Sequence, residues 1–193
     1  MMMHNARRVL GFAMAFAAIA FGPLVYAEQQ FEPAVWVERG ESTLAPFKKR
    51  LMGALIKGLE DGPEAAVEVC QLVAPEIAAE LSTAGVELGR TSHKLRNPRN
   101  APQAWVQPLL DDYVATPGKT EPEVVRLDSG AVGYVEPIFV QPMCLACHGR
   151  ALSPGVAARI DGHYPQDQAR GFEVGDFRGL FWVEFTEPAV ERP

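Results

Sequence analysis

One short stretch of the chain, Cys144-Leu145-Ala146-Cys147-His148, combines residues whose types and spacing suit one kind of chemistry. Two thiols three positions apart can each add to a vinyl group of haem, and the adjacent imidazole can then bind the iron. This is the attachment pattern of a c-type haem, in which thioether bonds hold the cofactor. The motif therefore predicts one covalent haem c bound through Cys144 and Cys147, with His148 as an axial iron ligand.

Two other chemistries use closely spaced cysteines, namely a redox dithiol and a zinc site. A thioredoxin-like dithiol opens a helix after a strand in a βαβ unit, and the surrounding sequence has no such pattern. Zinc needs a second pair of ligands, and the three cysteines and four histidines of the chain contain no second close pair. The sequence therefore favours haem attachment over both.

Thioether formation by the motif would leave Cys70 as a single thiol. Cys70 lies on the apolar side of a predicted helix, one turn before Pro75, which interrupts the backbone hydrogen bonds. An inward thiol beside such a break suits a second axial iron ligand, although a buried cysteine that only packs is also common. The alternative ligands are Met52, His93 and His163.

Residues 90–99 carry several basic side chains in a chain that is acidic overall. Arg90 and Arg96 are predicted to contact the two haem propionates, because guanidinium groups match carboxylates in geometry and charge. A solvated charged loop is the alternative explanation of the same pattern.

The first residues have the pattern of an export signal. Arg7 and Arg8 precede an apolar run over residues 9–21, which is shorter than the roughly 20 residues that span a bilayer. The small residues around Ala27 predict cleavage after that position, and an uncleaved membrane anchor is the alternative. We expect residues 1–27 to be a cleaved signal peptide and residues 28–193 to be one exported, periplasmic domain without a membrane span.

Cleavage removes two arginines and no acidic residue, so the mature chain carries 16 basic and 24 acidic side chains, a net charge of −8. Such a surface repels nucleic acid and suits a basic or neutral protein partner. We expect a redox or signalling protein as the partner, and the sequence identifies neither that protein nor the oligomeric state.

Apolar periodicity predicts two helices before the first strand. Residues 28–41 have no strong pattern and are expected to form an extended arm. Ser42 or Thr43 is expected to cap the first helix, and Gly62-Pro63 separates it from a second helix over residues 64–82. Pro75 predicts a kink or restart in this second helix.

The rest of the chain alternates short strands, loops and one helix. The expected elements are a strand at 86–90, a helix at 104–114, a hairpin at 124–135 and a last strand at 180–185. Residues 150–178 are rich in glycine, proline and charge, and are expected to wrap the haem edge. This order predicts an α+β domain with an antiparallel sheet.

Several further motifs accompany the cysteine pair and together resemble one known family. They are Val69-Cys70, Ala74-Pro75-Glu76-Ile77-Ala78, Gly89-Arg90-Thr91-Ser92, Arg96-Asn97-Pro98, Tyr164-Pro165, Asp167, Ala169, Gly171-Phe172 and Gly175-Asp176-Phe177-Arg178-Gly179. With these motifs the chain resembles the bacterial mono-haem c-type proteins long catalogued as a domain of unknown function. The resemblance implies a PAS-like antiparallel sheet with N-terminal helices packed around a covalent haem, and His148 and Cys70 as axial ligands.

The expected function follows from this ligation. A thiolate ligand favours ferric iron and a low potential, so reduction can weaken the bond to Cys70 and move its helix, as in a redox- or ligand-responsive sensor. A sensing role is also what the resemblance implies. The alternative is a simple periplasmic electron-transfer cytochrome. A haem enzyme such as a peroxidase needs an open iron position with an acid–base group over it, so enzymatic activity is not expected.

Overall fold

The computed structural model describes residues 31–186, all but the first of which lie in the unit that begins at Glu32. The predicted signal peptide and its cleavage site lie outside the described residues. The elements in chain order are α1 (Pro33–Glu60), α2 (Pro63–Leu81), β1 (Val86–Thr91), η1 (Pro98–Asn100), α3 (Gln107–Ala115), β2 (Glu123–Arg126), β3 (Val132–Phe139), η2 (Pro142–Cys144), α4 (Leu145–His148), α5 (Pro154–His163) and β4 (Phe177–Phe185).

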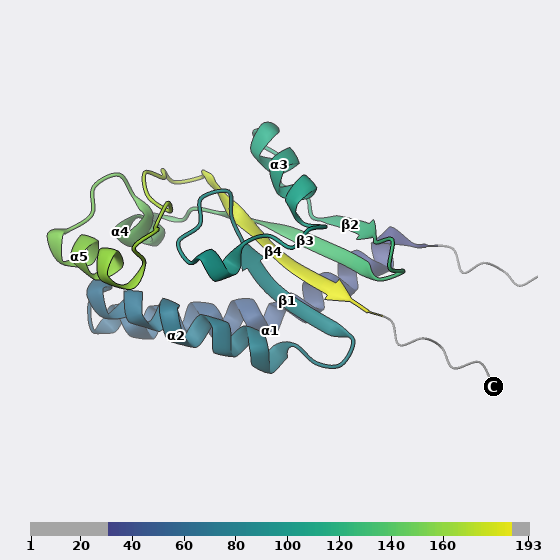
Figure 1. Ribbon diagram of the computed structural model, residues 1–193, viewed down its shortest axis with the longest axis horizontal. Helices are drawn as coiled ribbons and strands as arrows, with labels where there is room; N and C mark the ends of the chain where they lie inside the picture. Colours follow the sequence, from purple (N-terminus) through teal and green to yellow (C-terminus); the bar gives the residue numbers. More distant parts are fainter. Residues whose placement is uncertain (1–30, 187–193) are drawn as a thin grey trace, which may run out of the picture. The chain divides into compact units, whose positions relative to one another are not determined.

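One four-stranded sheet, with the strand order β1-β4-β3-β2, organises these elements (Figure 1). β2 and β3 form the predicted hairpin, and β4 pairs with both β1 and β3, so the last described strand is central. Every pair is antiparallel, which excludes the βαβ unit of a thioredoxin-like dithiol from this sheet. The predicted α+β class with an antiparallel sheet is confirmed.

Alternate residues of the central strands pack on opposite faces of the sheet, as strand geometry requires. Val135 and Trp182 form a buried cluster with Leu110 of α3 on one face. On the other face, the ring of Phe47 from α1 lies 5.8 Å from the ring of Phe181. Both faces of the sheet are therefore covered by helices.

Helices α1 and α2 run side by side along the face that carries Phe181, and α2 also contacts β1 and α5 (Figure 1). The residues that α2 buries are Ala66, Val67, Ala74 and Ile77. Cys70 is half-buried on the same helix. α2 continues through Pro75 as a single helix, so the expected restart does not occur.

Helix α1 begins at Pro33, so the prediction of an extended arm is wrong from that residue onward. Proline suits the first helical position because its fixed φ matches a helix. Tertiary contacts hold this first part of the helix, since the ring of Trp36 lies 5.4 Å from that of Phe185 and the Cζ of Arg39 lies 4.6 Å over the Phe185 ring. Because these contacts join residues far apart in the chain, a local sequence pattern does not predict them.

The predicted cap residues Ser42 and Thr43 therefore lie inside α1. Their hydroxyls donate to the carbonyl of Arg39 at 2.9 and 2.7 Å. Pro46, three or four residues later, has no N–H to offer a preceding carbonyl, and the helix continues through it.

The glycine-rich segment 150–178 contains helix α5, which was not predicted. The Oγ of Ser153 accepts a hydrogen bond from the N–H of Val156 at 3.2 Å and so caps the helix. Val156 and Ile160, four residues apart, are fully buried against Val67 of α2. Within residues 31–186, no helix is long and apolar enough to cross a membrane.

Candidate functional site

A cavity of about 380 Å³ lies between α1, α2, β1 and the cysteine motif. Its size falls in the range of small-molecule sites, roughly 300–1,000 Å³. Apolar side chains such as Phe47, Leu55 and Phe181 form much of its wall. All six residues singled out from the sequence line it: Cys70, Arg90, Arg96, Cys144, Cys147 and His148.

The motif lies on η2 and α4, two short helical elements that follow β3. The segment before β4 supports them from one side through backbone hydrogen bonds. Phe172 N donates to the carbonyl of His148 at 3.0 Å, and Gly171 N donates to the carbonyl of Gly149 at 3.1 Å. The position of the motif therefore depends on residues more than twenty positions further along the chain.

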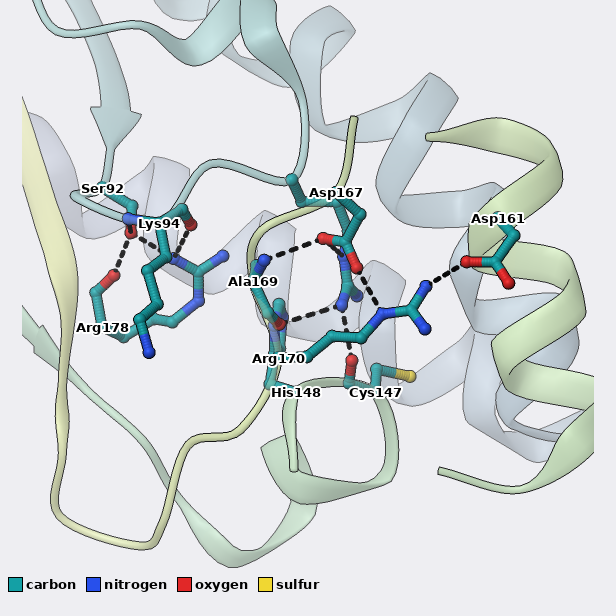
Figure 2. Close-up of polar contacts among 10 residues, drawn as sticks. Ser92, Lys94, Cys147, His148, Asp161, Asp167, Ala169, Arg170 and Arg178 are labelled. Atoms are coloured by element: carbon teal, nitrogen blue, oxygen red, sulfur yellow. Dashed lines mark hydrogen bonds and ion pairs between the residues drawn. The ribbon is translucent and has the colours of Figure 1, made fainter. Parts of the chain in front are cut away.

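The imidazole of His148 is held in one orientation and one tautomer. Its Nδ1 lies 2.8 Å from the carbonyl oxygen of Ala169 (Figure 2). Because a carbonyl only accepts, Nδ1 carries the proton and Nε2 keeps a free lone pair. Burial, followed by the charges of Arg178 and Arg96, lowers the pKa of His148 well below its usual value. The ring is thus a neutral nitrogen base, the form that binds metals.

A buried ion pair stabilises the backbone of the motif. The Nε of Arg96 donates to Oδ1 of Asp167 at 3.0 Å, and the two side chains are 11% and 2% exposed. Nη2 of Arg96 donates to the carbonyl of Cys147 at 2.5 Å and to that of Ala169 at 3.1 Å. Arg96 thereby links the motif to the chain that holds His148.

Asp167 in turn binds a second arginine. Its Oδ2 accepts from Nε of Arg170 at 2.7 Å, and Arg170 also reaches Asp161 of α5 at 2.5 Å (Figure 2). Burial alone would raise the pKa of Asp167, but hydrogen bonds from Arg170 and Arg96 outweigh it and lower the pKa. Sequence analysis assigned Arg96 to a propionate, and that role stays a prediction beside this structural one.

The three cysteines are unpaired by disulfides. Burial raises the pKa of the Cys147 thiol, and the charge of Arg96 offsets only part of that rise. Cys70 lies close enough to Cys147 to contribute to its titration.

The three alternative iron ligands, Met52, His93 and His163, lie at different places in the structure. Met52, 43% exposed on α1, lines the same cavity as Cys70. His93 does not line it and stacks instead on Phe177, with ring centroids 5.7 Å apart. His163 ends α5 and lines a different pocket. Among the described residues, no group of three His, Cys, Asp or Glu side chains could hold a metal ion such as zinc.

Sequence reasoning missed Arg178 as a site residue, although the motif that contains it carried part of the family resemblance. Arg178 lines the cavity from the start of β4. Its Nη1 donates to Oγ of Ser92 at 2.5 Å and to the carbonyl of Lys94 at 3.3 Å (Figure 2). Arg178 and Ser92 are 86 residues apart, so no local spacing indicates their contact.

Comparison with known proteins adds two findings. The sequence model of the Tll0287-like family matches residues 2–186. Among solved structures, the chain is similar to the crystal structure of the cyanobacterial heme-protein Tll0287, with a TM-score of 0.58 and 27% sequence identity. That match covers 84% of this chain and 100% of the other. No curated protein matches significantly.

Proposed function

This chain belongs to the Tll0287-like family, and on that premise we propose that it is an exported mono-haem c-type protein that responds to redox state or to a ligand. A similar solved structure is described as a heme-protein. The observation that carries the proposal is the meeting of Cys144, Cys147, His148 and Cys70 at one cavity.

The donor set of this cavity fits a covalent haem. Two free thiols at the attachment spacing face it, and the neutral imidazole of His148 has an unprotonated Nε2. The wall is largely apolar, as a porphyrin plane requires, and guanidinium groups are present for two carboxylates. When bound, haem supplies a one-electron iron couple.

Four side chains have distinct roles in this proposal. Cys144 and Cys147 would hold the cofactor through thioether bonds, and His148 would bind the iron through Nε2. The hydrogen bond from Nδ1 to Ala169 orients the ring and raises its basicity. Cys70, on the separate element α2, would be the second protein ligand of the iron.

A sensing role is supported by where Cys70 lies. Its helix packs against α1, α4, α5 and β1. Gain or loss of a bond at the Cys70 sulfur therefore acts on a helix with neighbours on several sides. A switch of this kind needs one local change and one element that it biases, and α2 is that element.

Electron transfer is the alternative function, and one observation favours it. The motif lies at the surface, where Met143 is 37% exposed and Ala146 is also exposed. A partner protein can approach such a site closely. An electron carrier would keep Cys70 bound in both redox states.

We do not propose an enzyme. Catalysis at the iron needs an open position and an acid–base group beside it. Among the described residues that line the cavity, His148 is the one histidine that could serve as such a group, and the proposal already uses it as an iron ligand. Export and cleavage after Ala27 remain part of the proposal.

The experiment that tests the proposal is production of the mature chain with a c-type maturation system. Denaturing electrophoresis with haem staining reports covalent attachment, and optical spectra are recorded oxidised, reduced, and reduced under CO. We expect stained protein, a low-spin oxidised spectrum, and a spectrum that changes when CO is added after reduction. Cys147→Ser is the control that should lose a thioether bond.

The outcomes separate the alternatives. Reduced protein that does not react with CO would favour the electron carrier over the sensor. A high-spin oxidised spectrum would reopen the enzyme hypothesis. Wild-type protein without covalent haem would contradict the whole proposal.

A further inference from the structure

The arginines that line the cavity carry more positive charge than the carboxylates of the described residues neutralise. Arg90, Arg96 and Arg178 all line it. Arg96 forms an ion pair with Asp167. Among residues 31–186, no carboxylate forms an ion pair with Arg90 or Arg178, and Asp167 is already occupied by Arg96 and Arg170.

Arg178 is the arginine whose environment is least favourable to an unpaired charge. Its two hydrogen bonds go to neutral acceptors, the hydroxyl of Ser92 and the carbonyl of Lys94, and both come from Nη1. Its Cζ lies 5.2 Å over the ring of Phe172. Burial, together with the charges of Arg90 and Arg96, lowers the pKa of Arg178 to about 10.

The backbone fixes Arg178 at this place. The next residue, Gly179, has φ +152°, and a Cβ there would lie 2.1 Å from the carbonyl oxygen of Thr91. β4 therefore approaches β1 closely at this point. The Oγ of Ser92 donates to the carbonyl of Arg178 at 2.6 Å, which locks the same contact from the other side.

Two nitrogens of Arg178 remain for a ligand. Nε and Nη2 donate to no described residue, and neither is among the fully enclosed side-chain atoms without a partner. They are therefore not fully enclosed by the described residues, and they belong to a side chain that lines the cavity. A guanidinium with two adjacent free N–H edges binds a carboxylate in the bidentate mode.

We propose that Arg178, held by Ser92 and Lys94, binds a haem propionate and is the main anion-binding group of the cavity. This inference rests on the proposed function. In this inference Arg96 stabilises the backbone of the motif, whereas Arg178 binds the propionate. Arg90 is the second guanidinium of the cavity without an ion pair to a described carboxylate.

The test compares holoprotein of wild type, Arg178→Gln and Arg178→Lys, with Arg159→Gln as the control. Arg159 is 50% exposed on α5 and lies outside the cavity lining. The readout is the midpoint potential as a function of pH. A nearby cation lowers a carboxyl pKa by about 1–3 units, so the pH-dependent step should move upward by that order in Arg178→Gln.

We also expect a lower midpoint potential in Arg178→Gln, because a cation near the iron favours the reduced state. Arg178→Lys should restore most of the potential, and the control should match wild type. A pH profile of Arg178→Gln that overlays wild type would overturn the inference while leaving the proposed function intact. If Arg178→Gln fails to fold, Arg178→Met takes its place, and a pH profile of Arg178→Met that overlays wild type would overturn the inference instead.

A free anion could use the same guanidinium chemistry. Added phosphate is therefore titrated into wild-type holoprotein. An unchanged potential agrees with occupation of Arg178 by a propionate. A phosphate-dependent potential in wild type that is absent in Arg178→Gln would show that Arg178 is open to solvent anions, and would contradict the proposal.

Discussion

At the scale of single residues, hydrogen bonds decide which atoms of the motif are available for chemistry. Nδ1 of His148 donates a hydrogen bond to the carbonyl of Ala169, which leaves the lone pair of Nε2 free. Arg96 forms an ion pair with Asp167 and donates hydrogen bonds to the carbonyls of Cys147 and Ala169. The roles of Cys144, Cys147 and His148 are predictions that sequence alone can make, because haem attachment depends on local spacing.

The role of Asp167 is tested by Asp167→Asn. This change leaves Arg96 buried without its partner, and we expect the free energy of unfolding to fall by about 3 kcal/mol at pH 7. The folded-state pKa of Asp167 is depressed, so its contribution is present above the ordinary carboxyl value of about 4 and is lost as the pH falls through the folded-state pKa. Urea unfolding at several pH values measures this difference.

The matched control for that change is Asp161→Asn. Asp161 also binds Arg170, but its side chain is 68% exposed. We expect a loss of less than about 1 kcal/mol, because water screens an exposed pair. Equal losses in the two variants, or a difference that does not shrink in acid, would contradict the role given to Asp167.

At the scale of elements, the sequence predicted most helices and strands but not the start of α1 or the existence of α5. Periodic apolar residues marked α2 and the hairpin. The first turns of α1 carry no strong helical pattern of apolar residues, and contacts with Phe185 and Tyr134 hold them instead. Arg178 was missed for a related reason, since its place depends on how β4 pairs with β1.

Two glycines of α1 test this account of the helix. A Cβ at Gly40 would lie 2.3 Å from Cγ of Tyr134, whereas a Cβ at Gly53 would meet nothing within 4 Å. We expect Gly40→Ala to destabilise the protein by about 1–3 kcal/mol through overpacking. Gly53→Ala should stabilise it by up to about 1 kcal/mol, because alanine favours a helix. Thermal unfolding that ranks the two variants in the opposite order would contradict the packing of α1 on β3.

At the scale of the whole described unit, the cavity is the feature that sequence could not provide. It lies where α1, α2 and β1, which follow one another in the chain, meet the motif, which comes only after β2 and β3. The motif predicted the cofactor chemistry, and the helix pattern predicted Cys70 as a ligand. Only the fold brings Cys70, Arg90 and Arg178 to the same space.

Cofactor binding should stabilise the elements around this cavity more than the sheet. The change that tests this is Cys144→Ser together with Cys147→Ser, which removes both attachment points. We expect amide hydrogen exchange to become faster in α2, α4 and α5 than in wild-type holoprotein, with little change in β3 and β4. If exchange became faster by the same amount in all elements, the cofactor would not stabilise this region selectively, and the prediction would be wrong.

The measurement that most directly tests the central claim is the oxidised optical and electron paramagnetic resonance spectrum of Cys70→Ala holoprotein. Met52→Ala serves as the matched control, because Met52 lines the same cavity from α1. We predict that Cys70→Ala loses the low-spin thiolate signature while its haem stays covalently attached, and that Met52→Ala keeps the wild-type spectrum. A wild-type spectrum in Cys70→Ala, or loss of the low-spin form in Met52→Ala, would contradict the assignment of Cys70 as the second iron ligand.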